Sequence, residues 1–285
     1  MGRLSQVVYY VRESPLLGVG FLMLGAVLVF GLMGPLFVDA SLAQPLSAPP
    51  RQSPSWEHPF GTDDSGRDLL SVMVVGVPLT LRIGLLAGAI GLGLGTFLGF
   101  TSGYIGGRFD GTIRGLVDTL LTVPPLVVLV SIASTIREEI SVNIMALVVA
   151  SLAWMWPTRV IRSQVLSMRE RTYVQMAKLN GLGTSEIIWK ELFPNLLPYL
   201  AANFANSVNW AILASIGLEA LGLGPQNDPT IGMTIYWAIT FSALIRGMWW
   251  WWAIPIFFIG VIFIGLLMVA IGLDKLANPR ERKAV

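Results

Sequence analysis

Six long apolar stretches run through this chain of 285 residues, and they constrain its fold more than any other feature. A helix needs about 20 apolar residues to cross the hydrocarbon core of a bilayer. The stretches lie at residues 15–38, 71–104, 113–136, 140–156, 196–223 and 249–273. Backbone groups in hydrocarbon must be satisfied within the segment, and no stretch alternates as a membrane β-barrel would. We therefore predict an all-α membrane protein with six transmembrane helices.

The composition excludes several classes of soluble protein. The chain is 54% hydrophobic and only 13% charged, which is far more apolar surface than one soluble core needs. It has no cysteine, and the single histidine, His58, cannot build an imidazole metal centre by itself. The net charge is only +2 and the basic residues are scattered, which argues against nucleic-acid binding. No Gly-x4-Gly-Lys-Ser/Thr motif and no catalytic set is evident, so we predict a non-enzymatic chain without a cofactor of its own.

The distribution of Lys and Arg predicts the orientation. If the N-terminus is cytoplasmic, most of the basic residues fall on the cytoplasmic side, as the positive-inside rule expects. Both termini are then cytoplasmic, the Pro- and Ser-rich stretch 39–70 and the loop 224–247 face outward, and the polar stretch 157–194 faces inward. We divide the chain into an N-terminal span with its external loop, residues 1–70, and a core, residues 71–285.

The most informative polar segment is residues 169–194, which is helical in pattern but too polar to enter the membrane. We predict a short helix at 173–179, ended by Gly181 and Gly183, and a second helix at 186–192 capped by Thr184 or Ser185. Glu186 and Lys190 are spaced i, i+4 with the acid first, the favourable order. A polar helix pair between two spans is typical of a docking surface for a partner.

This segment resembles the coupling loop of bacterial ABC import permeases, whose pattern is Glu-Ala-Ala, three residues, Gly, nine residues, Ile, one residue and Leu-Pro. The triplet falls on Gln175, Met176 and Ala177, the glycine on Gly181 and the proline on Pro194. Ala177, Gly181 and Pro194 keep the spacing of the pattern. Gln175, Met176 and, at the isoleucine position, Glu191 depart from it, which leaves open which side chains contact the ATPase.

A second motif extends the resemblance. Residues 58–70 read HPFGTDDSGRDLL, similar to the signature before the second helix in the C-type subunit of the dipeptide, oligopeptide and nickel permease family. SGYIGGRFD at 102–110, the Val117-Asp118 pair ahead of Pro124 and Pro125, and LGLGPQ at 221–226 fall where this family has comparable residues. The first span matches the added N-terminal helix of that subunit. The chain is identified as a member of this family over essentially its whole length.

The resemblance implies the transmembrane domain of a type I ABC importer, a multi-pass protein of the cell (inner or plasma) membrane. The implied partners are a second, B-type permease, two ABC ATPase subunits that bind ATP and Mg²⁺, and an extracytoplasmic solute-binding protein. The implied cargo is a peptide or a similar small solute, and the sequence does not choose among dipeptides, oligopeptides, nickel chelates and oligosaccharides. The implied contacts to the ATPase fall on Tyr173, Gln175, Met176, Ala177, Gly181, Glu186 and Pro194.

Two residues of the fifth span are candidates for the translocation path. Charged groups in hydrocarbon face a partner or water, which makes Glu219 of interest. The family commonly has an acid one turn earlier, where this chain has Ser215, and a shift of four residues returns to the same helix face. Glu219 either faces the path or makes an interhelical bond. For Asp118 we expect a structural pair with Arg114, and for Arg82 snorkelling to the outer interface.

Three other interpretations of the sequence have less support. An ion-coupled secondary transporter or channel acting alone is the alternative function, but no paired-carboxylate relay and no internal repeat supports it. His58 could be a ligand for a substrate metal, although fixing the outer loop is the simpler expectation. The glycines between Gly84 and Gly99 predict close helix packing rather than nucleotide binding.

Overall fold

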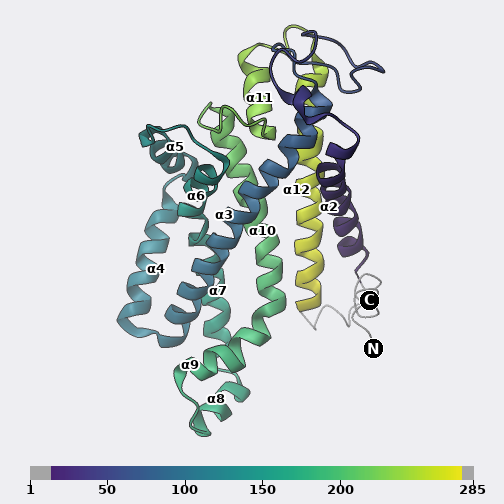
Figure 1. The fold of residues 1–285 in the computed structure, drawn as a ribbon. Helices are drawn as coiled ribbons and strands as arrows, with labels where there is room; N and C mark the ends of the chain where they lie inside the picture. Colours follow the sequence, from purple (N-terminus) through teal and green to yellow (C-terminus); the bar gives the residue numbers. More distant parts are fainter. Residues whose placement is uncertain (1–13, 278–285) are drawn as a thin grey trace.

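The computed structural model describes residues 14–277, which form an elongated bundle of helices without a named strand in that part of the chain (Figure 1). The helices are α2 (Pro15–Met33), α3 (Leu69–Ile105), α4 (Gly107–Thr122), α5 (Pro125–Thr135), α6 (Val142–Ala153), α7 (Met155–Met168), α8 (Thr172–Leu179), α9 (Thr184–Glu186), α10 (Phe193–Ala220), α11 (Ile231–Thr240) and α12 (Trp249–Ala277). A π-helical segment, η3 (Ile187–Leu192), joins α9 to α10. The predicted all-α class is confirmed.

Three helices, α2 with its extension to Leu36, α3 and α12, are long and apolar enough to cross a membrane. Two bent pairs, α4–α5 and α6–α7, raise the number of candidate spans to five if each pair is one span. Helix α10 has 28 residues, and its polar side chains include Asn203, Asn206 and Asn209. The sixth span therefore remains a prediction.

The third and fourth apolar stretches differ from the straight helices that the sequence suggests. Helices α4 and α5 meet at 87°, because Pro124 and Pro125 lack the amide hydrogen that a continuing helix needs and push the preceding residue out of helical geometry. Helices α6 and α7 meet at 41° around Trp154. Helix α7 continues to Met168, so the stretch expected to be a polar loop from residue 157 is helical over its first part.

Helix α3 is the central element of the bundle, and its glycines allow neighbours to approach closely. A Cβ added at Gly84 or Gly88 would meet Ile212 or Val208 of α10 at 2.3 or 2.9 Å, and a Cβ at Gly91 would meet Ala153 at 2.5 Å. Close helix packing is thus confirmed for these glycines. The glycine at position 93 differs, because its added Cβ would meet nothing within 4 Å.

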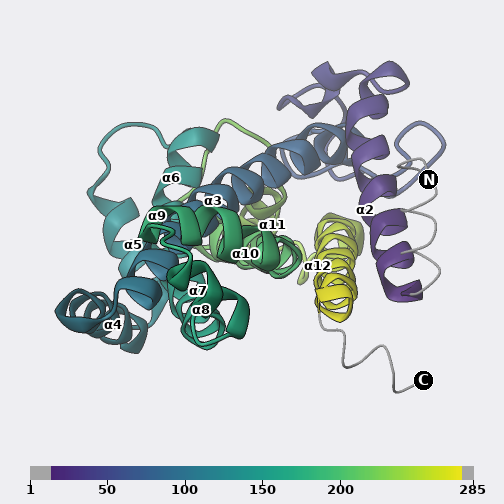
Figure 2. The same ribbon diagram turned by 90° about the horizontal axis from the view of Figure 1, so that it is seen from below.

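Helices α2 and α12 form a pair beside the rest of the bundle, and Figure 2 shows α12 between α2 and α10. A Cβ added at Gly20 would meet Val269 and the backbone of Gly265 at 2.9 Å. The C-terminal half of α2 packs on α3, where a Cβ at Gly31 would lie 2.6 Å from Pro78. The first span is therefore held by backbone contact with both neighbours.

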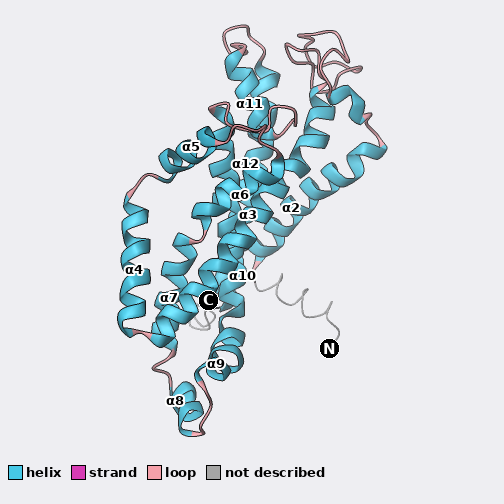
Figure 3. Cartoon of the chain, turned by 60° about the vertical axis from the view of Figure 1, so that its left-hand side comes forward, coloured by secondary structure: helices cyan, strands magenta, loops and turns pink. Residues whose placement is uncertain are grey.

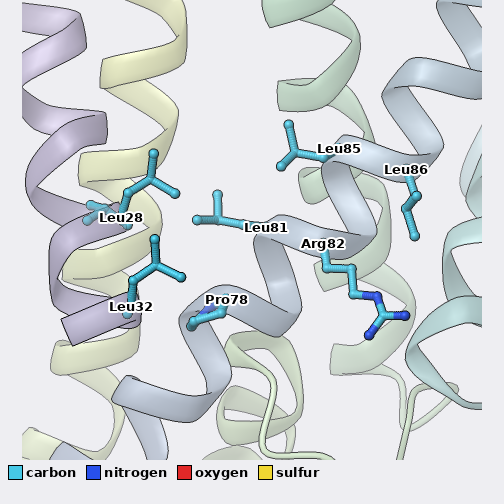
Figure 4. Close-up of a pocket in the computed structure, with 9 residues that line it drawn as sticks. Leu28, Leu32, Pro78, Leu81, Arg82, Leu85 and Leu86 are labelled. Carbon is cyan, nitrogen blue, oxygen red and sulfur yellow. The ribbon is translucent and has the colours of Figure 1, made fainter. Parts of the chain in front are cut away.

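A groove of about 330 Å³ separates α2 from α3 below this contact. Leu28 and Leu32 of α2 face Pro78 and Leu81 of α3 across it (Figure 4). The guanidinium of Arg82 points away from α2, and the side chain is exposed. Snorkelling of Arg82 to the outer interface stays a prediction.

The polar segments lie at the two ends of the long helices. The loop after α2 and helix α11 are at one end, and α8 and α9 are at the other, toward which α2 begins and α12 ends (Figures 1 and 3). The stretch 224–247, expected to be a loop, contains α11, whose N-cap Thr230 accepts a hydrogen bond from Met233 N–H at 3.2 Å. This short apolar helix covers the end of α10.

Candidate functional site

Helix α8 of the 169–194 loop ends in a Schellman turn. Leu182 N–H donates to the Ala177 carbonyl at 3.1 Å, and Gly181 N–H donates to the Lys178 carbonyl at 3.0 Å. Gly181 has a φ of +82°, which glycine adopts without the steric penalty of a side chain. The predicted helix and its glycine stop are confirmed.

The N-cap of the second helical segment lies one residue earlier than the sequence predicts. Gly183, not Thr184 or Ser185, is the N-cap, because its backbone already has the extended conformation of a capping residue. Glu186 Oε2 accepts from Gly183 N–H at 3.2 Å, and Glu186 Oε1 accepts from Lys190 Nζ at 2.8 Å. The hydrogen bond from Lys190, followed by that from Gly183, holds the pKa of the Glu186 carboxyl below its usual value.

Helix α8 has two apolar faces, one buried and one exposed. Val174 and Ala177 point inward and are 0% and 7% exposed. Tyr173, Met176 and Leu179, spaced by three residues, form the outer face and are 36%, 53% and 80% exposed. We call these three side chains the outer face of α8. A short polar-loop helix that exposes apolar side chains on its far side is typical of a protein-docking surface.

The inner face of α8 is packed into a cluster that reaches three long helices. The buried members of this cluster are Phe100, Ile161, Val165, Val174, Ala177, Ile187, Leu192, Leu196 and Leu200. Lys178 Nζ lies 5.5 Å from the ring centroid of Tyr104, and Arg169 Nη1 donates to the Gly103 carbonyl at 3.2 Å. Helix α8 is therefore packed directly against the ends of α3, α7 and α10.

Most of the residues proposed for ATPase contact are on the surface of the 169–194 loop. Gln175, Gly181, Glu186 and Pro194 are exposed, as is the outer face of α8. Ala177 differs, because its methyl group is buried in the cluster beneath α8. Ala177 therefore packs α8 onto this cluster, unlike the other residues proposed for ATPase contact.

Glu219 and Ser215 are fully buried in α10. Glu219 Oε2 accepts hydrogen bonds from Thr230 Oγ1 at 2.5 Å and from Met233 N–H at 3.0 Å. A Cβ added at Gly232 would lie 2.3 Å from this oxygen, so the glycine leaves room for the carboxyl group. The Ser215 hydroxyl donates to the Ile212 carbonyl at 2.9 Å. Glu219 thus bonds across to α11, which is the interhelical bond considered for it. Whether Glu219 also faces the translocation path stays a prediction.

Ion pairs join α4 to α7 toward the end that carries the 169–194 loop. Asp118 lies 3.5 Å from Arg114 and 3.9 Å from Arg159, so the expected local pair forms and gains a second partner. Arg162 Nη2 donates to Asp110 Oδ2 at 2.6 Å. Sequence reasoning missed this second pair, since the residues are far apart in the chain and only the acidic end of SGYIGGRFD signals it.

The loop between α2 and α3 is fixed by its own polar side chains. His58 Nδ1 lies 2.8 Å from Asp68 Oδ2, and Asp63 Oδ1 accepts from Ser65 N–H and Arg67 N–H at 2.8 and 2.9 Å. Burial raises the pKa of Asp63 despite these hydrogen bonds. Among the described residues, no group of three His, Cys, Asp or Glu side chains could hold a metal ion. These contacts match the loop-fixing interpretation of His58.

Comparisons with known proteins agree on one family. Residues 91–283 match the family described as "Binding-protein-dependent transport system inner membrane component". The chain is 29% identical to the dipeptide transport system permease protein DppC of Alkalihalophilus pseudofirmus, over 95% of this chain and 88% of the relative. It is 31% identical to a putative peptide permease protein of Brucella abortus, over 80% and 75%, and 28% identical to the oligopeptide transport system permease protein OppC of Bacillus subtilis, over 95% and 88%.

The family match covers the 169–194 loop and α10, the elements that carry the candidate residues. The peptide-permease relatives extend the similarity to nearly the whole chain. The family description and the names of these relatives do not favour a transporter or channel that acts alone. The chain therefore belongs to the family of inner membrane components of binding-protein-dependent transport systems.

Proposed function

We propose that this chain is the C-type permease subunit of an ATP-driven importer that takes up peptides. The names of its relatives, dipeptide and oligopeptide transport system permeases, support the choice of cargo. In the proposed complex the chain pairs with a B-type permease, two ATPase subunits bind ATP and Mg²⁺, and a solute-binding protein delivers peptide from outside. The chain itself performs no covalent chemistry.

The proposed topology has six spans in the cell membrane and both termini in the cytoplasm. Helix α10 is the span that its hydropathy alone does not identify, and its length of 28 residues supports this assignment. The start of α2 and the end of α12 lie toward the same end of the molecule as α8 (Figure 1), which supports a common side for the termini and the 169–194 loop.

The single observation that carries the proposal is the outer face of α8. Its exposed apolar side chains stand on a helix whose other face is packed against the ends of α3, α7 and α10. We propose that an ATPase subunit binds this face, so that closure of the ATPase dimer moves the long helices between inward-open and outward-open packings. ATP binding supplies the bias between the two packings.

The test is co-purification of the native complex after mild detergent extraction. Met176→Asp and Leu179→Asp place charges on the outer face of α8 without touching the buried cluster, so both variants should lose the ATPase and keep the second permease. Leu46→Asp is the matched control, because Leu46 is 90% exposed in the outer loop at the opposite end. Retention of the ATPase by both α8 variants would show that it binds elsewhere.

A further inference from the structure

A cavity of about 430 Å³ lies in the membrane part of the bundle, between α4 and α5, α6 and α7, and α10. Pro125, Trp156, Asn206, Ser207 and Trp210 are among the residues that line it. Residues 203–210 lie near the middle of the apolar stretch 196–223. The cavity is therefore about midway along the predicted span.

Both helix bends of the structure open onto this cavity. Pro125 begins α5 directly after the 87° bend, and Ala153 and Met155 stand on either side of the 41° bend. Irregular backbone at membrane depth is tolerated where it is buried in protein or lines a water-filled cavity. Residues at both breaks line this cavity, which is the second of these two cases.

Helix α10 turns its polar side chains toward the same cavity. Asn203, Asn206 and Trp210 are spaced i, i+3 and i+7, and Ser207 lies beside them on one helix face. Asn203 Nδ2 donates to the Tyr199 carbonyl of its own helix at 2.9 Å. Asn206 is exposed, and its carboxamide makes no hydrogen bond to another residue in 14–277. An unpaired amide is costly in hydrocarbon, so Asn206 must meet water, cargo or a partner.

The chemistry of the lining selects the kind of ligand. The described lining residues offer carboxamide, hydroxyl and indole groups and include no ionisable side chain. A carboxamide both donates and accepts, as a peptide bond does, and indole rings pack on flat or apolar groups. A metal chelate or a charged peptide terminus finds no counter-charge in this lining.

We propose that this cavity is a subsite of the translocation path for an uncharged stretch of peptide backbone. Asn206 and Ser207 hydrogen-bond the backbone amide groups of the passing peptide, and Trp156 and Trp210 pack against it. Contacts to the backbone do not depend on the peptide's side chains, which suits cargo of varied sequence. The inference rests on the proposed function, since it assumes that the imported solute is a peptide.

Because this chain has no cysteine, a thiol reagent labels it only at a cysteine that a substitution introduces. In the full complex in proteoliposomes, Asn206→Cys is labelled with a membrane-impermeant, positively charged methanethiosulfonate reagent that is supplied on both faces of the membrane, and mass spectrometry follows this chain alone. Trialanine, supplied with the binding protein and ATP, should slow labelling. At tenfold excess over the half-protecting concentration the rate should fall about tenfold.

The control is Asn195→Cys on the same face of α10, about three turns away and outside the cavity lining. It should be labelled at the same rate with and without trialanine. ATP-dependent trialanine uptake by the wild-type complex, measured separately, tests the proposed function. If the wild type imports trialanine but Cys at position 206 is unlabelled or unprotected, the subsite is overturned while the proposed function stands.

A second variant does not depend on labelling. Asn206→Leu removes the carboxamide and keeps the same number and branching of side-chain heavy atoms, and Asn195→Leu makes the same change outside the cavity. Asn206→Leu should reduce trialanine uptake at least about tenfold, whereas binding-protein-stimulated ATP hydrolysis stays within about twofold of wild type. Wild-type uptake in Asn206→Leu would overturn the subsite.

Discussion

His58 Nδ1 lies 2.8 Å from Asp68 Oδ2 at the outer end of α3, and both side chains are buried. Asp68 is also the N-cap of α3, since its Oδ1 accepts from Ser71 N–H at 2.9 Å. One carboxylate therefore fixes the outer loop and begins the longest helix. His58 and Asp68 are the first and eleventh residues of the HPFGTDDSGRDLL motif, so this contact gives both of them a structural role.

Asp68→Ala should destabilise the protein, because it removes the cap and leaves His58 buried without its partner. Loss of the cap costs about 1 kcal/mol, and the unpaired imidazole adds about 1–3 kcal/mol. Thermal unfolding of the purified complex in detergent measures the change. Asp68→Asn retains an acceptor for Ser71 N–H and is the control with the smaller loss. Equal midpoints for Asp68→Ala and wild type would contradict the assigned role.

The glycines of α3 give a matched pair of substitutions on one helix. Gly91→Ala should lower stability by about 1–3 kcal/mol, because its Cβ would lie 2.5 Å from Ala153 Cβ and 2.8 Å from the Ala153 backbone. Gly93→Ala meets nothing within 4 Å and should be neutral or raise stability by up to about 1 kcal/mol. Detergent melting curves of the two variants decide between packing and a general intolerance of alanine in α3.

Gly181→Ala tests the turn that ends α8. Its φ of +82° strains any residue with a Cβ, at a cost of about 1–2 kcal/mol, and the turn is expected to loosen α8. Hydrogen exchange at the amides of residues 173–182 should accelerate, and co-purification of the ATPase should weaken. Gly183→Ala, where φ is −71°, is the control expected to behave as wild type. Equal exchange in both variants would count against a strained turn.

The sequence predicted the helical class, α8 with its glycine stop, and the glycine packing of α3, because each depends on local chemistry or short periodicity. The bend at Pro124 and Pro125 also has a local cause. The 41° bend at Trp154 also has a local cause, because Pro157 lacks the N–H that would bond the Ala153 carbonyl and its ring crowds that carbonyl, but the apolar pattern of residues 140–156 predicts one straight stretch. The place of Asn206 could not be predicted, because it depends on two bent helix pairs, α4–α5 and α6–α7, that line the same cavity.

Glu186 provides a pH prediction for the 169–194 loop. Since hydrogen bonds from Lys190 and Gly183 lower its pKa from the usual 4.5, the folded loop favours the ionised form. This stabilisation is complete above pH 4.5 and is lost as the pH falls through the lowered pKa. Hydrogen-exchange protection factors at residues 183–190 should therefore fall only in the acidic range. Glu186→Gln should remove that dependence, and a wild-type profile in this variant would show that another group titrates.

Glu219 distinguishes a structural acid from one that the path requires. Its carboxyl accepts from Thr230 Oγ1 and Met233 N–H, and Gly224 and Gly232 enclose it, so it holds the start of α11 on α10. Glu219→Ala should lower stability by about 1–3 kcal/mol, because Met233 N–H and Thr230 lose their buried acceptor. Glu219→Gln keeps an acceptor of the same shape and should retain both the melting temperature and ATP-dependent peptide uptake. A stable Glu219→Gln complex that has lost uptake would instead assign the charge of Glu219 to the translocation path.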